Sequence, residues 1–171
     1  MNPDAVGFQG GGFDGRYVYL SPLLSPKGQH GLVTRFDTQK SFTTTSSWNT
    51  FDLTMIDGGA VPSQADGGAP IKVGYIGTGF DGRFLYFAGN QSPAVHGWIA
   101  RFDTSKPALD DPAAWSFYDA NRLHVDAKGM CGAVYDGQYM YFVPCFSSVI
   151  VRFYAGFPAK LPKFPKGGSF L

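Results

Sequence analysis

The sequence predicts an all-β fold of three four-stranded antiparallel repeats, the third of them incomplete. One phrase recurs three times, at residues 13–20, 80–87 and 135–142. In each copy an Asp-Gly pair separates two runs rich in aromatic and β-branched residues, which is typical of a tight hairpin turn. Apolar residues then occupy consecutive positions, as in a strand that is covered on both faces.

The chain repeats a longer plan around these phrases. An Arg-Phe-Asp-Thr strand at 35–38 and a Trp strand at 48–53 follow the first copy, and 101–104 and 115–119 follow the second in the same order. This matched order indicates an internal repeat. We expect a single domain, 1–171, with repeats at about 6–57, 71–120 and 128–156. A Pro/Lys-rich tail, 157–171, follows, and its spaced prolines exclude a central strand.

We expect the two residues of each pair, Asp14-Gly15, Asp81-Gly82 and Asp136-Gly137, to occupy the two central positions of a hairpin turn. That register places Cys131 opposite Phe142, three positions away from Cys145. Disulfide bonding requires Cα atoms within about 7 Å, so we expect two buried thiols unless the hairpin is bulged. The strand residues that follow the turns should be buried: Tyr17, Val18, Tyr19, Phe84, Leu85, Tyr86, Tyr139, Met140 and Tyr141.

Charge and hydropathy exclude several classes of partner. The 14 basic and 13 acidic residues nearly cancel, which argues against nucleic acid and anionic membrane partners. The chain contains no run of roughly 18 apolar residues, and residues 1–4 lack the pattern of a signal peptide. The default expectation is a cytoplasmic protein, with secretion left open. The sequon Asn90-Gln91-Ser92 would matter only in a secretory pathway.

The phrases at 12–19, the Arg-Phe-Asp-Thr strands and the Trp-x-x-Phe-Asp pattern resemble the tandem repeats of bacterial β-propeller-like proteins, similar in type to kelch repeats. The resemblance covers most of residues 6–156. It implies that each repeat is a propeller blade of four antiparallel strands, and it implies a scaffold without specifying an activity.

Two patterns suggest chemistry. Residues 77–82 and 10–15 match a dinucleotide-binding glycine fingerprint, but a hairpin should follow each match in place of the required helix, so we expect no nucleotide cofactor. The turn residues Asp14, Asp81 and Asp136 could serve acid–base chemistry, yet turn geometry alone explains all three. We therefore expect no catalytic residue and no metal site.

The candidate ligand-binding residues lie at equivalent positions of the first two repeats. They are His30 and His96, Trp48 and Trp115, and Arg35 and Arg101, together with the loop insertion 58–70. Each also has a structural explanation. The tryptophans are expected to pack between blades. The arginines, with Asp37 and Asp103, are expected to bridge neighbouring blades through ion pairs or hydrogen bonds.

The sequence favours a non-enzymatic binding or protein-interaction scaffold, with a carbohydrate or a protein as ligand. The alternatives are a glycan-active, glycosidase-like propeller enzyme and a fragment of a larger propeller. Three blades cannot close into a ring, since propellers use roughly four to eight. We therefore expect a homodimer in which three repeats from each chain form one six-bladed ring.

Overall fold

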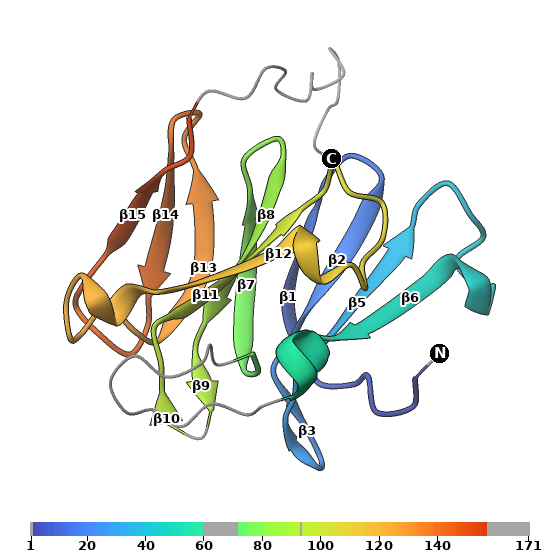
Figure 1. The fold of residues 1–171 in the computed structure, drawn as a ribbon, viewed down its shortest axis with the longest axis horizontal. Helices are drawn as coiled ribbons and strands as arrows, with labels where there is room; N and C mark the ends of the chain where they lie inside the picture. The colour runs from blue at the N-terminus through green and yellow to red at the C-terminus, as the bar shows by residue number, and fades with distance from the viewer. Residues whose placement is uncertain (1, 60–71, 93, 157–171) are drawn as a thin grey trace, which may run out of the picture.

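The computed structural model describes residues 2–59, 72–92 and 94–156, and within these ranges the fold is all-β (Figure 1). The first sheet has the strand order β1-β2-β5-β6, the second β7-β8-β11-β12 and the third β13-β14-β15, all antiparallel. The expected strand numbers, four, four and an incomplete three, are confirmed for the described residues.

The strands of the first sheet are β1 (Phe8–Phe13), β2 (Tyr17–Pro22), β5 (Leu32–Asp37) and β6 (Trp48–Asp52). The second sheet contains β7 (Tyr75–Phe80), β8 (Phe84–Gly89), β11 (Trp98–Asp103) and β12 (Trp115–Asp119). The third contains β13 (Met130–Tyr135), β14 (Tyr139–Pro144) and β15 (Val151–Tyr154). Two short hairpins pair β3 (Leu24–Ser25) with β4 (Gly28–Gln29) and β9 (Gln91–Ser92) with β10 (Ala94–Val95). Four 3-10 turns are η1 (Thr45–Ser47), η2 (Leu53–Gly59), η3 (Pro112–Ala114) and η4 (Ala120–Arg122).

The repeated aspartate holds each hairpin turn together. Asp81 Oδ1 accepts hydrogen bonds from the backbone N–H groups of Arg83 (2.9 Å) and Phe84 (2.6 Å), and its Oδ2 accepts one from the Tyr86 hydroxyl (2.8 Å). Asp14 and Asp136 make the same three hydrogen bonds in their own turns. The carboxylates therefore have the structural role that the sequence predicts.

The turn lies one residue later than predicted. Phe13 pairs with Val18, and the Asp14 N–H donates to the Tyr17 carbonyl, so Gly15 and Arg16 are the central residues. Glycine has a φ of +104° at this position. The same shift occurs in the other two copies, because the aspartate uses its side chain to bind the turn instead of entering the positive-φ position itself.

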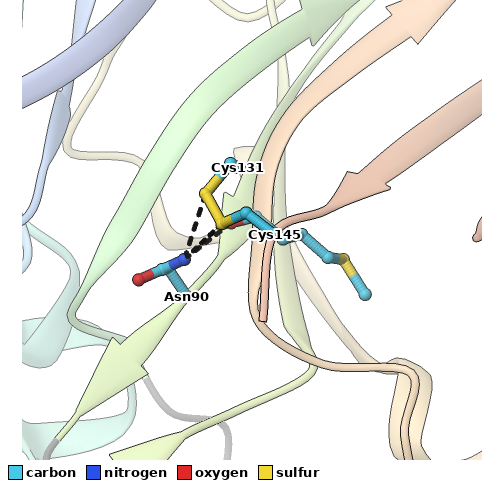
Figure 2. The surroundings of a disulfide bond; sticks show 4 residues. Asn90, Cys131 and Cys145 are labelled. Atoms are coloured by element: carbon cyan, nitrogen blue, oxygen red, sulfur yellow. Dashed lines mark hydrogen bonds between the residues drawn. A yellow bond between two sulfur atoms is a disulfide. The ribbon is translucent and has the colours of Figure 1, made fainter. Parts of the chain in front are cut away.

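The expectation of two free thiols is wrong, because Cys131 and Cys145 form a disulfide with a Cα–Cα distance of 5.7 Å (Figure 2). Two features bring them together: the later turn, and a β-bulge in β13. Met130 pairs with Pro144 and Gly132 with Val143, so Cys131 is the extra residue of the bulge. β1 and β7, which are the first strands of the first and second sheets, have a bulge at the same position.

Asn90 of the sequon points toward this disulfide (Figure 2). Its side-chain amide is buried, donates to the Met130 carbonyl (3.0 Å) and lies 3.6 Å from Cys131 Sγ. An amide nitrogen that is buried and engaged in this way cannot carry a glycan in the folded chain.

The three sheets stack through their first strands, with β7 between β1 and β13 (Figure 1). Glycine makes this approach possible. A Cβ added to Gly77 would lie 2.6 Å from the Cys131 carbonyl oxygen and 2.8 Å from Gly132 Cα, and one added to Gly10 would lie 2.9 Å from Gly77 Cα. Backbone thus packs directly against backbone along a row formed by Gly10, Gly77 and Gly132.

Two hydrophobic clusters fill the spaces between the sheets. One joins the first and second sheets and the other joins the second and third. Leu85, Tyr86 and Phe87, consecutive residues of β8, are all buried, which confirms the prediction of a strand covered on both faces for the middle repeat. Among the described residues, no helix has the length and apolarity needed to cross a membrane.

We predict that Gly77→Ala destabilises the chain more than Gly137→Ala. Both glycines have positive φ, but nothing lies within 4 Å of a Cβ at Gly137, whereas the Gly77 position meets backbone. The Gly137 variant should lose about 1 kcal/mol from the backbone conformation alone. The Gly77 variant should lose a further 1–3 kcal/mol from overpacking. Urea unfolding of both variants measures this difference, and equal losses would contradict the close packing of first strands.

We also predict that the unreduced, denatured chain shows no thiol that reacts with a thiol reagent. Replacing both Cys131 and Cys145 by Ala should lower the unfolding free energy by about 2–4 kcal/mol, because the disulfide no longer restricts the unfolded chain. Two reactive thiols in the unreduced protein would refute the pairing.

Candidate functional site

The two predicted histidines have structural roles. His96 is buried, its Nδ1 accepts the Trp98 N–H (3.2 Å) and its Nε2 lies 3.1 Å from the Val73 carbonyl oxygen. This pattern requires the neutral ring with the proton on Nε2. Burial lowers the pKa of His96 to about 4. His30 has the same two kinds of partner, and burial also lowers its pKa.

The expected bridge between neighbouring repeats does not involve the ion pairs of Asp37 and Asp103. These aspartates pair with the turn arginines Arg16 (2.8 Å) and Arg83 (2.7 Å) of the same sheet. The Arg83 guanidinium lowers the pKa of Asp103 to about 2.

Arg35 instead bridges the first two sheets. It stacks on the Tyr17 ring at 4.4 Å and donates to the Pro107 carbonyl of the second repeat (2.7 Å). The prediction of an inter-repeat bridge is therefore confirmed for this arginine. Arg101 stacks on Phe84 in the same way, but its hydrogen bond goes to Ser116 Oγ (3.0 Å) of its own sheet.

The two tryptophans occupy equivalent positions in different surroundings. Trp115 is buried against Phe102 (4.8 Å between ring centroids) and Phe87 (5.7 Å), in the space between the first two sheets. Trp48 packs against Phe36 on the outer face of the first sheet and is only half-buried. Packing between sheets is thus confirmed for Trp115.

The six candidate residues do not form one surface. His30 and His96 lie at the end of the sheets where β5 and β11 begin. Trp48 and Trp115 pair with residues near the other end of those strands. Ligand binding by these residues stays a prediction, and residues 60–70 of the insertion and the 157–171 tail lie outside the described residues.

The stack has two outer faces, one on the first sheet and one on the third, and both expose apolar side chains. We name each face after its sheet. The first outer face consists of Phe36, Phe42 and Trp48, and the third outer face consists of Tyr139, Tyr141, Ile150 and Arg152. Phe42 is 66% and Ile150 is 67% exposed, whereas the equivalent residues Leu109 and Val33, inside the stack, are 1% and 0% exposed.

A groove of about 520 Å³ lies between the second and third sheets. Its walls come from β11 and β12 on one side and from β14 and β15 on the other, and the lining is largely aromatic and aliphatic. Arg101 and Arg152 also line it, and no carboxylate of the described residues does.

Among the described residues, no group of three or more His, Cys, Asp or Glu side chains could hold a metal ion.

Comparisons with family models, curated proteins and solved structures found no match to this chain. The outer faces and the groove are therefore the features on which a functional proposal rests.

We predict that stability falls as pH decreases from about 6.5 to 4, in part through His96. A histidine whose pKa is lowered in the folded state binds protons preferentially in the unfolded chain, so acid favours unfolding within this window. His96→Gln should reduce the slope of unfolding free energy against pH, while the exposed His124→Gln is a control for loss of an imidazole. Identical slopes in His96→Gln and the unsubstituted chain would contradict a buried neutral ring.

Proposed function

We propose that this chain is a non-enzymatic interaction scaffold of the β-propeller type, and that a second copy covers its two outer faces. Three repeats from each chain would then form one six-bladed ring, a number within the usual range of four to eight blades. The observation that carries the proposal is a difference in exposure between equivalent positions. Residues on the outer faces are exposed, whereas their equivalents in the neighbouring repeats are buried inside the stack.

Equivalent positions suggest how the two faces would fit. Inside the chain, Tyr19 and Val33 of the first sheet pack against Phe102 and Trp115 of the second, together with Leu109. The third outer face has Tyr141 and Ile150 at the positions of Tyr19 and Val33, as the strand registers indicate. The first outer face has Phe36, Trp48 and Phe42 at the positions of Phe102, Trp115 and Leu109. The same contact could therefore form between chains.

Side-chain size supports the same pairing. Gly12 faces Thr78 and Leu85 of the next sheet, and a Cβ there would lie 2.8 Å from Leu85 Cδ1. The equivalent residue of the third sheet is Val134, which is exposed. In the proposed ring Val134 would face Gly11, the equivalent of Thr78.

The smaller neighbours leave room for the larger valine. Val18 stands in the first sheet where Leu85 stands in the second, so both residues opposite Val134 are smaller than their counterparts inside the chain. Since packed interfaces tolerate changes that conserve total volume, this exchange favours contact between the third and first sheets.

The arginine stack supplies a polar counterpart. Arg152 lies 4.4 Å above the Tyr139 ring, as Arg35 lies above Tyr17. Arg35 donates to the carbonyl of Pro107, in the loop that follows the Arg-Phe-Asp strand β11. In the ring Arg152 would lie beside the corresponding loop of the second copy, which follows β5.

The scaffold would present its loops to a protein or carbohydrate ligand. The hairpins β3–β4 and β9–β10 lie at one end of the stack (Figure 1), and His30 and His96 follow them directly in the chain. Because the histidine rings bind backbone carbonyls, their role at this surface would be to hold the loops in place. The three turn aspartates are fully engaged in their own turns, so they support a scaffold over a glycan-active enzyme.

The disulfide also favours an oxidising compartment over the cytoplasm as the place of action. Disulfides in stable domains persist mainly in secreted and periplasmic proteins. Secretion is therefore the localisation that we propose, in place of the cytoplasmic default.

Sedimentation equilibrium at micromolar concentration tests the ring. The chain should sediment with twice its monomer mass, and Phe42→Asp or Ile150→Asp should weaken self-association at least tenfold, because each places a charge in an apolar contact. Val125→Asp is the matched control, since Val125 is equally exposed but lies outside both outer faces. A chain that stays monomeric at tens of micromolar would contradict the dimer and leave repeats of a longer protein to cover the faces.

A further inference from the structure

The groove between the second and third sheets lies where the described part of the third sheet has no fourth strand. Within the described residues β15 forms the edge of its sheet, whereas β6 and β12 cover the equivalent strands β5 and β11 (Figure 1). Phe153 has the register position of Phe102, but Phe153 is 43% exposed and Phe102 is 0% exposed. The difference is the Trp115 ring, which covers Phe102.

The groove preserves the surroundings of a buried tryptophan. Trp115 packs on Phe102 and Phe87, and Tyr19 of the neighbouring sheet lies 5.9 Å from Phe102. In the groove the equivalent residues are Phe153, Phe142 and Tyr86. Tyr86 lies 6.0 Å from Phe153 and 6.1 Å from Phe142. All three line the groove, so its walls match the Trp115 site with the indole missing.

The edge of β15 offers backbone hydrogen bonds beside this space. The Ala155 N–H donates to the Gln138 carbonyl (3.0 Å), and antiparallel partners alternate between bonded and non-bonded pairs. Arg152 and Tyr154 consequently direct their N–H and C=O groups away from β14. An edge of this kind is a template for an added strand.

We propose that this groove and the β15 edge bind an extended segment of a partner protein as a fourth antiparallel strand. The segment carries aromatic side chains at two alternate positions, as Trp115 and Phe117 do in β12, and these enter the groove. It is neutral or acidic, because Arg101 lines the site and no carboxylate of the described residues does. The proposal goes beyond ring formation, since the groove lies on the opposite side of the third sheet from its outer face.

The chain's own residues 157–171 are a poorer occupant. In β12 the residue after the tryptophan, Ser116, lies opposite Arg101. The Ala120 N–H donates to the Gly97 carbonyl, and hydrogen-bonded pairs alternate with non-bonded pairs along the two strands. Ser116 and Arg101 are therefore a hydrogen-bonded pair. In the tail Pro165 follows Phe164 and has no N–H to donate. The tail also contains lysines and no acidic residue, which does not complement Arg101.

A synthetic peptide with the sequence of residues 111–119, Asp-Pro-Ala-Ala-Trp-Ser-Phe-Tyr-Asp, provides a direct probe. Labelled with fluorescein, it should bind the full chain saturably in a fluorescence anisotropy titration. Replacing its Trp by Ala should weaken binding at least tenfold. Phe153→Ala in the chain should do the same, because this exposed ring is the contact that the indole would cover.

Methylation of single peptide amides gives a matched control. A methyl group on the Ser nitrogen removes an N–H that faces β15, and binding should fall at least tenfold. A methyl group on the next nitrogen, that of Phe, removes an N–H that faces solvent and should change affinity less than twofold. Equal effects of the two methylations, or no saturable binding, would overturn strand addition.

Two further variants separate the possible outcomes. Phe42→Asp alters the first outer face only and should bind the peptide as the unsubstituted chain does, so failure of the ring would leave this result unaffected. If the unsubstituted chain does not bind but a Phe164→Asp/Phe170→Asp variant does, the tail itself fills the groove. That result would also overturn the proposal of a partner segment.

Discussion

The stack of sheets depends on direct contact between the backbones of its first strands. Gly10, Gly77 and Gly132 form a row in which a side chain on Gly77 would collide with the neighbouring strand. Because the strands approach so closely, the second sheet is covered on both faces, and its strand β8 can be apolar at consecutive positions. At Gly132 no described residue lies within 4 Å of an added Cβ, so one further strand could approach there.

An open stack has two unequal ends, and this inequality determines what the chain can assemble with. One end exposes the aromatic cluster around Trp48, and the other exposes tyrosines and a stacked arginine. In the proposed ring these unlike faces would meet head to tail, the first outer face of one copy against the third outer face of the other. The groove has a separate origin, because the three described strands of the third sheet leave both an apolar space and a free backbone edge along β15.

Repetition in the sequence made the fold predictable, whereas single-residue shifts in register were not. The phrases around Asp14, Asp81 and Asp136 predict hairpins and sheet order correctly, because the residues on both sides of each turn are strongly strand-forming. The disulfide was missed because the turn is centred one residue later and β13 contains a bulge. A signal for the bulge was present in Gly10 and Gly77, which recur at one position of the repeat, lie at the register shifts of β1 and β7 and have positive φ. The structural partners of the candidate histidines could not be predicted, because backbone carbonyls carry no sequence signature.

The central claim is that the outer faces of the first and third sheets meet between two chains. Thiol cross-linking with a short bismaleimide tests it most directly, using Phe42→Cys and Ile150→Cys in separate chains. Val33 and Leu109, their equivalents inside the chain, share one hydrophobic cluster, so the account predicts covalent dimers when the two variants are mixed and none when either is treated alone. Cross-linking of each variant with itself, or none in the mixture, would contradict the account.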